Sequence, residues 1–454
     1  MAKYYNITRN DLKCMIKEAY RKVVLLMESM QEGGAAGHMT HPFDADDFTF
    51  GDYKQLVIDL LRTGIERYSE KLDGMNIFAT VDRTGTPRFA RNKGHIKSPE
   101  GGMDPEGIKA RWGAEGADPT ILAAYTKAYR VFSDVVSKLK NPVAFFNGDG
   151  YKIYVNAEVI DQTHPNVIPY PEDVLSFHGL AAFADDGSGN GIDIPDEILD
   201  EKMKVLTNLM PDFHSENGKA QITPEVAIDI KGNNDELINK FISQIDAIEQ
   251  KTGVNDNTTI IQYREKLLPE WMRKHGYGII LDSPYADYFL NRWVYGKKDP
   301  SMSTLKSQMR KNGVENWQEV AAMASEFDGQ EKAGAPVKVA MSEIMRPVEM
   351  FFYRLGDEMI SRCRGYANTG REDYALGVMT DLLNATKKLV TDSDCLEAQR
   401  EITPALQKLA ELDFGYHAME GVVFNYKGHT FKLTGSFAAL NRAINSRFKL
   451  PKDK

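Results

Sequence analysis

The sequence predicts an α+β protein in which an antiparallel β core is interrupted by a long helical block. Strand-like runs with alternating apolar residues occur in 67–193 and again in 413–454, whereas 194–412 carries helical periodicity. The 42% of hydrophobic residues in this 454-residue chain can supply a substantial core. We expect the two strand-rich segments to combine in one core, which would bring together residues that are distant in the sequence.

The composition excludes several classes of protein. The cysteines, Cys14, Cys363 and Cys395, are widely spaced and form no CxxC pair, which argues against a disulfide framework and a thiolate zinc site. We expect a cytoplasmic protein without a membrane segment, because no apolar run has the length of a membrane helix and the charged start lacks the apolar run of a signal peptide. The net charge of -9 leaves room only for a local basic surface that could meet nucleic acid.

Residues 1–66 are expected to form a helical segment. The first thirty residues have apolar side chains near a 3.6-residue period, and a second helical pattern covers Tyr53 to Leu61 and ends at Gly64. Histidines and aspartates in the loop between the two helices suggest either a metal site or a structural or substrate-orienting role. These residues are His38, His41, Asp44, Asp46 and Asp47.

Segment 67–193 is expected to be the first part of the β core. Residues 76–82 and 86–91 have the pattern of two strands joined by a turn at Thr84-Gly85. Residues 119–138 have helical periodicity. In 152–160 apolar and polar side chains alternate, which predicts a strand with one apolar face and with Glu158 on the other face.

The helical block, 194–412, has glycine-rich joints and no fixed repeat period. Strand character returns in the last segment, 413–454, where 421–433 has the pattern of a hairpin that turns at Lys427-Gly428. The chain then closes on a basic helical tail.

The sharpest local feature for chemistry is SEKLDG, in which Lys71 ends a predicted strand and Asp73 and Gly74 follow it. The glycine allows a tight turn that presents the lysine, and a lysine becomes a nucleophile when nearby cations or desolvation lower its pKa. An ordinary surface lysine in a hairpin also explains KLDG when this tetrapeptide is taken alone.

Together with other segments of the chain, KLDG resembles the nucleophile motif of the covalent nucleotidyltransferases, which are the ATP-dependent DNA and RNA ligases and the messenger-RNA capping enzymes. Further motifs of that superfamily follow in the same order: ARNKGHI with Arg91 and Lys93, YVNAEVI with Glu158, VLSFHG with Phe177, EGVVF with Glu420, and FKLTG with Lys432. The short span from Glu420 to Lys432 is most similar to phage RNA ligases. The GHMTHPFD segment is similar to ligase-like proteins of large tailed phages.

The resemblance implies an antiparallel-sheet nucleotidyltransferase core, the adenylation core of ligases, with the helical block as a large insertion. It implies ATP and Mg²⁺ as cofactors, a covalent AMP on Lys71, and the host cytoplasm as the location if a phage encodes the chain. Lys71, Asp73 and Lys432 would be catalytic, and Glu158 and Glu420 would hold the metal or the ribose. The nucleotide-binding residues would be Glu70, Gly74, Arg91, Lys93, Glu158, Phe177 and Glu420.

The chain departs from this superfamily in two respects. Ligases usually carry a second lysine two positions after the one matched by Lys432, and this chain has Thr434 there. The helical block also lies outside the resemblance. Each matched residue has a plainer explanation as well: Glu158 as a solvent-facing strand residue, Phe177 as part of the core, and Lys432 as protection of a sheet edge.

Three interpretations therefore stay open. The first is an ATP-dependent polynucleotide ligase-like enzyme, with RNA favoured over DNA. The second is a non-catalytic nucleotide-binding or virion-associated scaffold that retains a ligase-like core. The third is a nucleotidyltransferase with another acceptor, as in RNA capping or protein modification.

The predicted acceptor is a nucleic acid with a 5′-phosphate. From Lys427 to Lys454 the chain carries seven basic residues and one acidic residue, which suggests a phosphate-facing surface beside the site. Arg442, Arg447 and Lys449 are the expected contacts. A solvated basic tail with no partner explains the same composition.

Overall fold

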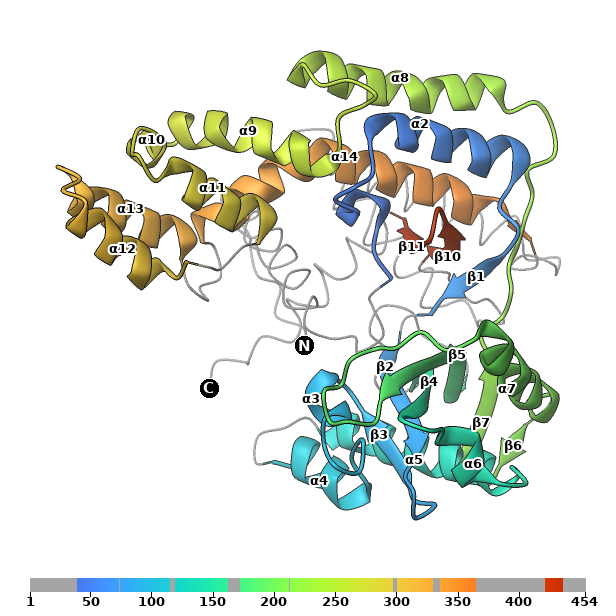
Figure 1. The fold of residues 1–454 in the computed structure, drawn as a ribbon. Coiled ribbons are helices and arrows are strands. Elements are labelled where there is room, and N and C mark those ends of the chain that lie inside the picture. Colours follow the sequence, from blue (N-terminus) through green and yellow to red (C-terminus); the bar gives the residue numbers. More distant parts are fainter. Residues whose placement is uncertain are drawn as a thin grey trace, which may run out of the picture.

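The computed structural model describes residues 39–72, 74–114, 119–161, 172–211, 213–296, 300–329, 335–364 and 421–435. These residues form a mixed α/β structure with a six-stranded sheet, a three-stranded sheet and a two-stranded ladder of β8 (Ala227–Ile228) and β9 (Cys363–Arg364). In Figure 1 the three-stranded sheet and its helices form the upper part, the larger sheet forms the lower part, and β1 (Tyr68–Lys71), the edge strand of the three-stranded sheet, lies on the side facing the larger sheet. The predicted α+β class is confirmed.

The six-stranded sheet has the strand order β3-β2-β4-β5-β7-β6, and only β5 and β7 are parallel. Helix α5 (Pro119–Ser137) covers one face, where Phe132 packs against Phe177. The helix and the strand predicted at 119–138 and 152–160 are therefore confirmed. The strands are β2 (Met75–Val81), β3 (Pro87–Ala90), β4 (Tyr151–Ile160), β5 (Val174–Ala184), β6 (His214–Ser215) and β7 (Gly218–Ile222), and the flanking helices are α3 (Lys93–Ile96), α4 (Pro105–Trp112), α6 (Pro142–Phe146) and α7 (Asp196–Leu209).

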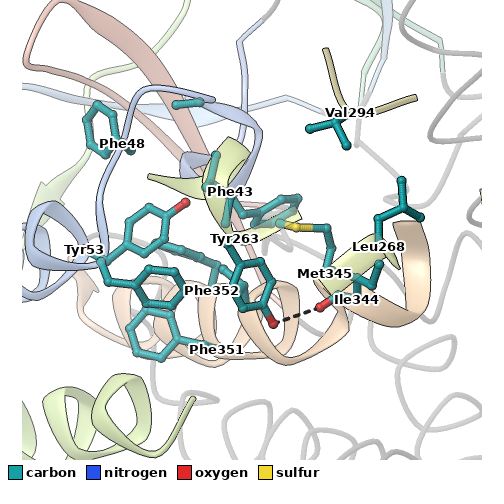
Figure 2. Packing of buried hydrophobic residues seen from close by; sticks show 14 of the residues in the cluster. Phe43, Phe48, Tyr53, Tyr263, Leu268, Val294, Ile344, Met345, Phe351 and Phe352 are labelled. Atoms are coloured by element: carbon teal, nitrogen blue, oxygen red, sulfur yellow. Dashed lines mark hydrogen bonds between the residues drawn. The ribbon is translucent and has the colours of Figure 1, made fainter. Parts of the chain in front are cut away.

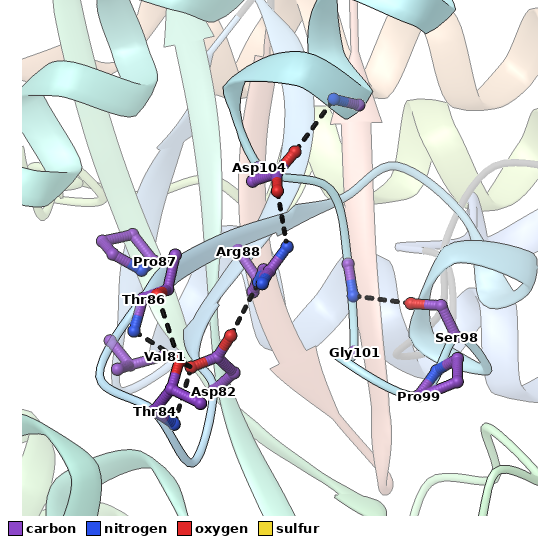
Figure 3. Close-up of polar contacts among 12 residues, drawn as sticks. Val81, Asp82, Thr84, Thr86, Pro87, Arg88, Ser98, Pro99, Gly101 and Asp104 are labelled. Atoms are coloured by element: carbon purple, nitrogen blue, oxygen red, sulfur yellow. Dashed lines mark hydrogen bonds and ion pairs between the residues drawn. The ribbon is translucent and has the colours of Figure 1, made fainter.

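A polar network closes the hairpin of β2 and β3 (Figure 3). One carboxylate oxygen of Asp82 accepts hydrogen bonds from the main-chain N–H groups of Thr84 and Thr86, and Arg88 Nε lies 2.8 Å from the other. Arg88 also reaches Asp104, the N-cap of α4. Burial raises the pKa of Asp82, but these partners outweigh burial and lower the pKa below its usual value. The predicted turn is confirmed.

The three-stranded sheet joins segments from distant parts of the chain. β1 pairs antiparallel with β10 (Gly421–Tyr426), which forms a hairpin with β11 (His429–Thr434). Lys427 and Gly428 occupy the turn with φ values of 48° and 80°, and positive φ at both positions is what a type I′ turn requires. The predicted hairpin at Lys427-Gly428 is confirmed.

The helix predicted over Tyr53 to Leu61 is also confirmed. α2 (Phe50–Ile58) starts at a capping box formed by Thr49 and Asp52 and continues as one π-helical turn, η3 (Asp59–Thr63). The helix stops at Gly64, whose φ of 76° favours glycine.

One face of the three-stranded sheet packs on a layer of helices. α2 and α14 (Pro336–Ser361) share a buried apolar cluster with β10 and β11, and α8 (Asp235–Thr252) packs against both helices. Figure 2 shows the aromatic centre of this cluster, where the Tyr53 and Phe352 rings lie 4.8 Å apart. The Tyr263 hydroxyl donates a hydrogen bond to the main-chain oxygen of Ile344, which ties a neighbouring helix to α14.

That neighbouring helix, α9, begins an arm of helices that extends to one side of the molecule in Figure 1. α9 packs against α14, and the later helices pack mainly on one another. Within the described part of the chain, no helix is both long enough and apolar enough to cross a membrane. The helices of the arm are α9 (Ile260–Lys274), α10 (Gly278–Leu281), α11 (Ala286–Tyr295), α12 (Met302–Lys311) and α13 (Trp317–Asp328).

Two segments of the chain connect the three-stranded sheet with the six-stranded sheet, and they run next to each other. After β1 the chain turns through Gly74 and enters the larger sheet as β2. After β7 the chain leaves the larger sheet, and 224–226 runs along the free edge of β1, where the Val226 N–H donates to the Tyr68 oxygen at 2.8 Å. The two sheets are therefore joined at the end of β1.

The larger sheet does not end at residue 193, where the sequence placed the start of the helical block. β6 and β7 follow that position, so this predicted boundary was wrong. Both strands are short and only partly buried, and their sequences lack the alternation of apolar and polar residues that predicts a strand. The helix predicted in the first thirty residues and the block beyond residue 364 lie outside the described residues.

Gly356 allows α14 to pack directly on β11, which gives a stability test. A Cβ at this position would lie 2.3 Å from the main-chain oxygen of Thr434. Alanine gains about 1 kcal/mol over glycine in a helix interior, but overpacking against backbone costs about 1–3 kcal/mol. We expect Gly356→Ala to lower the free energy of unfolding by about 1–2 kcal/mol in urea titrations.

Gly278→Ala is the matched control, because the nearest atoms to its added Cβ belong to the Arg273 side chain, 3.9 Å away. A Gly356→Ala protein at least as stable as wild type would contradict the close packing of α14 on β11.

Candidate functional site

Lys71 and Lys432 lie on the same face of the three-stranded sheet. Lys71 pairs with Gly421, while Lys432 pairs with Val423, two residues further along β10. Directly paired residues, and residues two apart in a strand, point to the same side of a sheet. This register separates the two lysine Cα atoms by about 12 Å in a flat sheet, a gap across which two lysine side chains can reach one bound group. The structure thus brings together two residues that the motifs predicted.

Glu70 points to the opposite face. It is only 3% exposed and lies among the residues that pack on the helices, with its neighbours Tyr68 and Val422 in the apolar cluster. Its charge contributes to the raised pKa of Cys363, for which burial is the larger cause. Glu70 therefore does not share a surface with Lys71, because successive strand residues alternate between faces.

Gly74 and Glu158 form the junction between Lys71 and the larger sheet. The Gly74 N–H donates to Glu158 Oε1 at 3.2 Å. A Cβ on residue 74 would lie 2.5 Å from the main-chain oxygen of Val159 and 2.7 Å from Glu158 Cγ, so the close approach requires glycine. Gly74 follows Lys71 by three positions, so its N–H holds Glu158 near the end of the strand that carries the predicted nucleophile.

The sheet face that carries Glu158 has a polar floor formed by Asn76, Asn156 and Gly179. Asn76 donates from its amide to the Asn156 side-chain oxygen at 2.6 Å, and Gly179 pairs with Asn156 across the sheet. No atom lies within 4 Å of a Cβ built on Gly179, so the space above it is open. Arg91 binds the main-chain oxygen of Asn76 at one side of this floor.

Phe177 does not face the floor. It is fully buried on the α5 side of the sheet, so the predicted stacking role was wrong. A β-bulge after Phe177 leaves His178 without a direct partner, because Ala157 pairs with Phe177 and Asn156 pairs with Gly179. The His178 ring instead contacts Glu158, with Nε2 3.3 Å from Oε2. No sequence signal pointed to His178, because a bulge is invisible to a period-two pattern.

The remaining predicted residues are placed as follows. Lys93 is exposed on α3 and binds Asn190 at 2.9 Å. Asp73 and Glu420 lie outside the described residues, as does the tail with Arg442, Arg447 and Lys449. Within the described ranges, no group of three His, Cys, Asp or Glu side chains could hold a metal ion.

The loop with His41 and Asp44 has a structural role beside β11. His41 is buried, stacks on Phe43 at 4.6 Å between ring centroids and precedes the short helix η2 (Pro42–Asp44). Thr40 extends the sheet beside Lys432, whose N–H donates to the Thr40 oxygen at 3.0 Å. These contacts support the structural explanation of the histidine, and His38 is outside the described residues.

Asp44 lies near a second carboxyl group, Glu349 of α14. The Asp44 side chain reaches solvent, yet the surrounding protein raises its pKa, while the His41 N–H and the positive charge of Lys432 act in the opposite direction. Desolvation and the Asp44 charge raise the pKa of Glu349 to about 7. No local sequence pattern pointed to this acidic pair, because its members are about 300 residues apart.

A cavity of about 310 Å³ lies elsewhere, on the side of the larger sheet that α5 covers. Its lining has no carboxylate-histidine pair and does not include the residues of the polar floor. We therefore place the candidate site at the junction of the two sheets and not in this cavity. The lining residues are Pro105, Ile108, Thr126, Tyr129, Arg130, Ser133, Asp134 and Asn217.

No family model matches this chain, and neither a curated protein nor a solved structure matches it. The chemistry of the junction must therefore be inferred from its own residues. What they provide is two lysines on one sheet face, a carboxylate that is fixed by the main chain three residues after Lys71, and an open polar floor.

Gly179 offers a way to test whether the floor receives a ligand. Since an added Cβ meets no atom within 4 Å, Gly179→Val should change the free energy of unfolding by no more than about 0.5 kcal/mol. The valine would occupy the open space, so we expect ATP, the ligand that the motifs predict, to bind at least about tenfold more weakly by calorimetry, a loss of about 1.4 kcal/mol. Unchanged ATP affinity would remove the floor from the site.

Glu349 gives a pH-dependent prediction. Between pH 4.5 and about 7 the unfolded chain ionises Glu349 and the folded chain keeps it protonated, so its contribution to stability falls as the pH rises through this window. Allowing for partial exposure, we expect Glu349→Gln to be more stable than wild type by about 1–3 kcal/mol at pH 8 and by little at pH 5, from urea titrations. The exposed Glu319→Gln is the control, and an equal difference at both pH values would contradict the raised pKa.

Proposed function

We propose that this chain is an ATP-dependent, ligase-like nucleotidyltransferase that works through a covalent lysine-AMP intermediate on Lys71. The observation that carries the proposal is the shared sheet face of Lys71 and Lys432, together with Glu158, which the Gly74 N–H holds at the end of β1. We also propose that the two sheets together form a nucleotidyltransferase core.

In the first step the neutral amine of Lys71 attacks the α-phosphate of ATP. A nitrogen–phosphorus bond forms, the bond to the β-phosphate breaks, pyrophosphate leaves and the amine proton passes to solvent. Positive charge near a lysine favours its neutral form, and it also offsets the negative charge that develops on the phosphate. Lys432 is placed to supply that charge from the same sheet face.

Magnesium fits this site as a companion of the nucleotide. Among the described residues Glu158 is the carboxylate at the junction, and both of its oxygens already accept hydrogen bonds or contact a histidine nitrogen. Mg²⁺ commonly uses one or two carboxylates together with substrate phosphates. Glu158 is therefore the described side chain that could approach an ion carried by ATP, with Glu420 as the second predicted ligand.

The proposed acceptor is a polynucleotide with a 5′-phosphate, RNA in preference to DNA, in the cytoplasm. Its phosphate oxygen would attack the lysine-linked AMP and release Lys71, and a 3′-hydroxyl would then displace AMP and seal the strand. The basic residues after Lys427 support this acceptor. Thr434, buried on the face of Lys71 and Lys432, supplies no second cation, which is the observation that favours the scaffold alternative.

Label transfer tests the proposal. After incubation with α-³²P-labelled ATP or GTP and Mg²⁺, denaturing electrophoresis should show label from ATP on the wild-type chain. Lys71→Ala should abolish the label because it removes the attacking nitrogen, with little change in thermal stability since Lys71 is partly exposed. Lys204→Ala, an exposed lysine of α7, is the matched control and should label normally.

Label retained by Lys71→Ala would move the adduct to another residue. Absence of label with both nucleotides would favour the non-catalytic scaffold. Label on the chain with transfer to a protein or to an RNA 5′-diphosphate end, but not to a 5′-phosphate, would favour the other acceptors.

A further inference from the structure

Glu158 is held through both of its carboxylate oxygens. The Gly74 N–H binds Oε1 at 3.2 Å, and His178 Nε2 lies 3.3 Å from Oε2. The Glu158 and His178 side chains are 10% and 15% exposed, so little solvent competes for these contacts. The direction of the carboxylate therefore depends on the position of the His178 ring.

The other ring nitrogen of His178 has a defined partner. Nδ1 lies 2.9 Å from the hydroxyl oxygen of Thr223, which lies 3.0 Å from the hydroxyl oxygen of Ser176. An ionised carboxylate only accepts hydrogen bonds, so Nε2 must carry the proton that faces Glu158. In the neutral ring Nδ1 then accepts from the Thr223 hydroxyl, so Glu158 selects the tautomer and Thr223 satisfies the other nitrogen.

The β-bulge in β5 places the ring. In an unbroken ladder His178 would stand directly opposite Asn156, since Glu158 pairs with Ser176. The extra residue displaces His178 from the ladder, and its ring contacts Glu158. Bulges that redirect one side chain are frequent next to active sites.

Both supports of Glu158 are connected to the strand that carries Lys71. Gly74 follows β1 by three residues. Thr223 donates its N–H to the Phe177 oxygen at 2.9 Å, and the next residue, Pro224, accepts from the Glu70 N–H at 3.2 Å. Thr223 therefore contacts β5 directly and is followed at once by the segment that pairs with β1.

We propose that His178, held between Glu158 and Thr223 as the Nε2–H tautomer, is a positioning residue that fixes the Glu158 carboxylate relative to Lys71. Its effect on a reaction rate rests on the proposed nucleotidyl transfer. The tautomer lock is a property of the folded chain and requires no reaction.

The lock is tested by nitrogen-15 NMR of histidine-labelled full-length protein at about pH 8.5, above the range in which imidazole ordinarily titrates. The signal missing from His178→Gln identifies the ring. We expect the Nε2–H tautomer in wild type and in Thr223→Ser, and a mixture of tautomers in Glu158→Gln, whose side-chain amide can either donate to Nε2 or accept from it. An Nδ1–H ring in wild type, or no change in Glu158→Gln, would overturn the proposal.

The positioning role is tested by the rate of label transfer from ATP. Partners that orient an active-site ligand are commonly worth 10–100-fold, so we expect His178→Ala to lower the rate constant of adduct formation by about that factor, with KM for ATP changed by less than about threefold. His178→Gln retains a donor toward Glu158 and should recover most of the rate. The exposed Thr207→Val is the control for threonine replacement.

Equal losses in His178→Ala and His178→Gln, or a change confined to KM, would overturn the positioning role. If the wild-type chain takes no label from either nucleotide, the proposed function fails, and the NMR experiment by itself then decides whether His178 is held as the Nε2–H tautomer against Glu158. The two proposals can therefore fail separately.

Discussion

The close passage of the chain at Gly74 over the backbone of β4 is the constraint on which the site depends. A Cβ there would lie 2.5 Å from the Val159 oxygen, so a larger residue would push β2 away from β4 or lift the end of β1. With glycine, β1 can leave the three-stranded sheet directly after Lys71 and enter the six-stranded sheet. One short turn thereby places a lysine of one sheet beside a carboxylate of the other.

Because side chains alternate along a strand, one face of each sheet packs on helices while the other face carries the candidate site residues. In the three-stranded sheet, Val422 and Leu433 pack on the helices, while Lys71 and Lys432 share the other face. In the larger sheet, Phe177 packs on α5, while Asn156 and Glu158 lie on the face with the polar floor. The helices bury apolar side chains on one face of each sheet, and on the other face of the larger sheet the polar groups lie beside a small apolar cluster that includes Phe78, Tyr154 and Phe183.

The β-bulge in β5 and the segment after β7 fix the position of the Glu158 side chain. The bulge moves His178 toward Glu158, and Thr223 reaches the same ring from the chain that pairs with β1. Hydrogen bonds of this kind, shielded from solvent, hold a carboxylate in one direction more firmly than exposed ones do. Asp44 lies near enough to Lys432 for the two charges to attract each other, and the charge of Asp44 in turn raises the pKa of Glu349.

The sequence by itself determined the local elements: the hairpin turn at Lys427-Gly428, the stop of the helix at Gly64 and the alternating strand of Glu158 follow from backbone preferences and short-range periodicity. Only the tertiary structure decided the pairing of β1 with β10, the membership of β7 in the larger sheet and the choice of His178 over Phe177 for the floor. These depend on contacts between distant segments and on one extra residue in a ladder. Local periodicity carries no information about either.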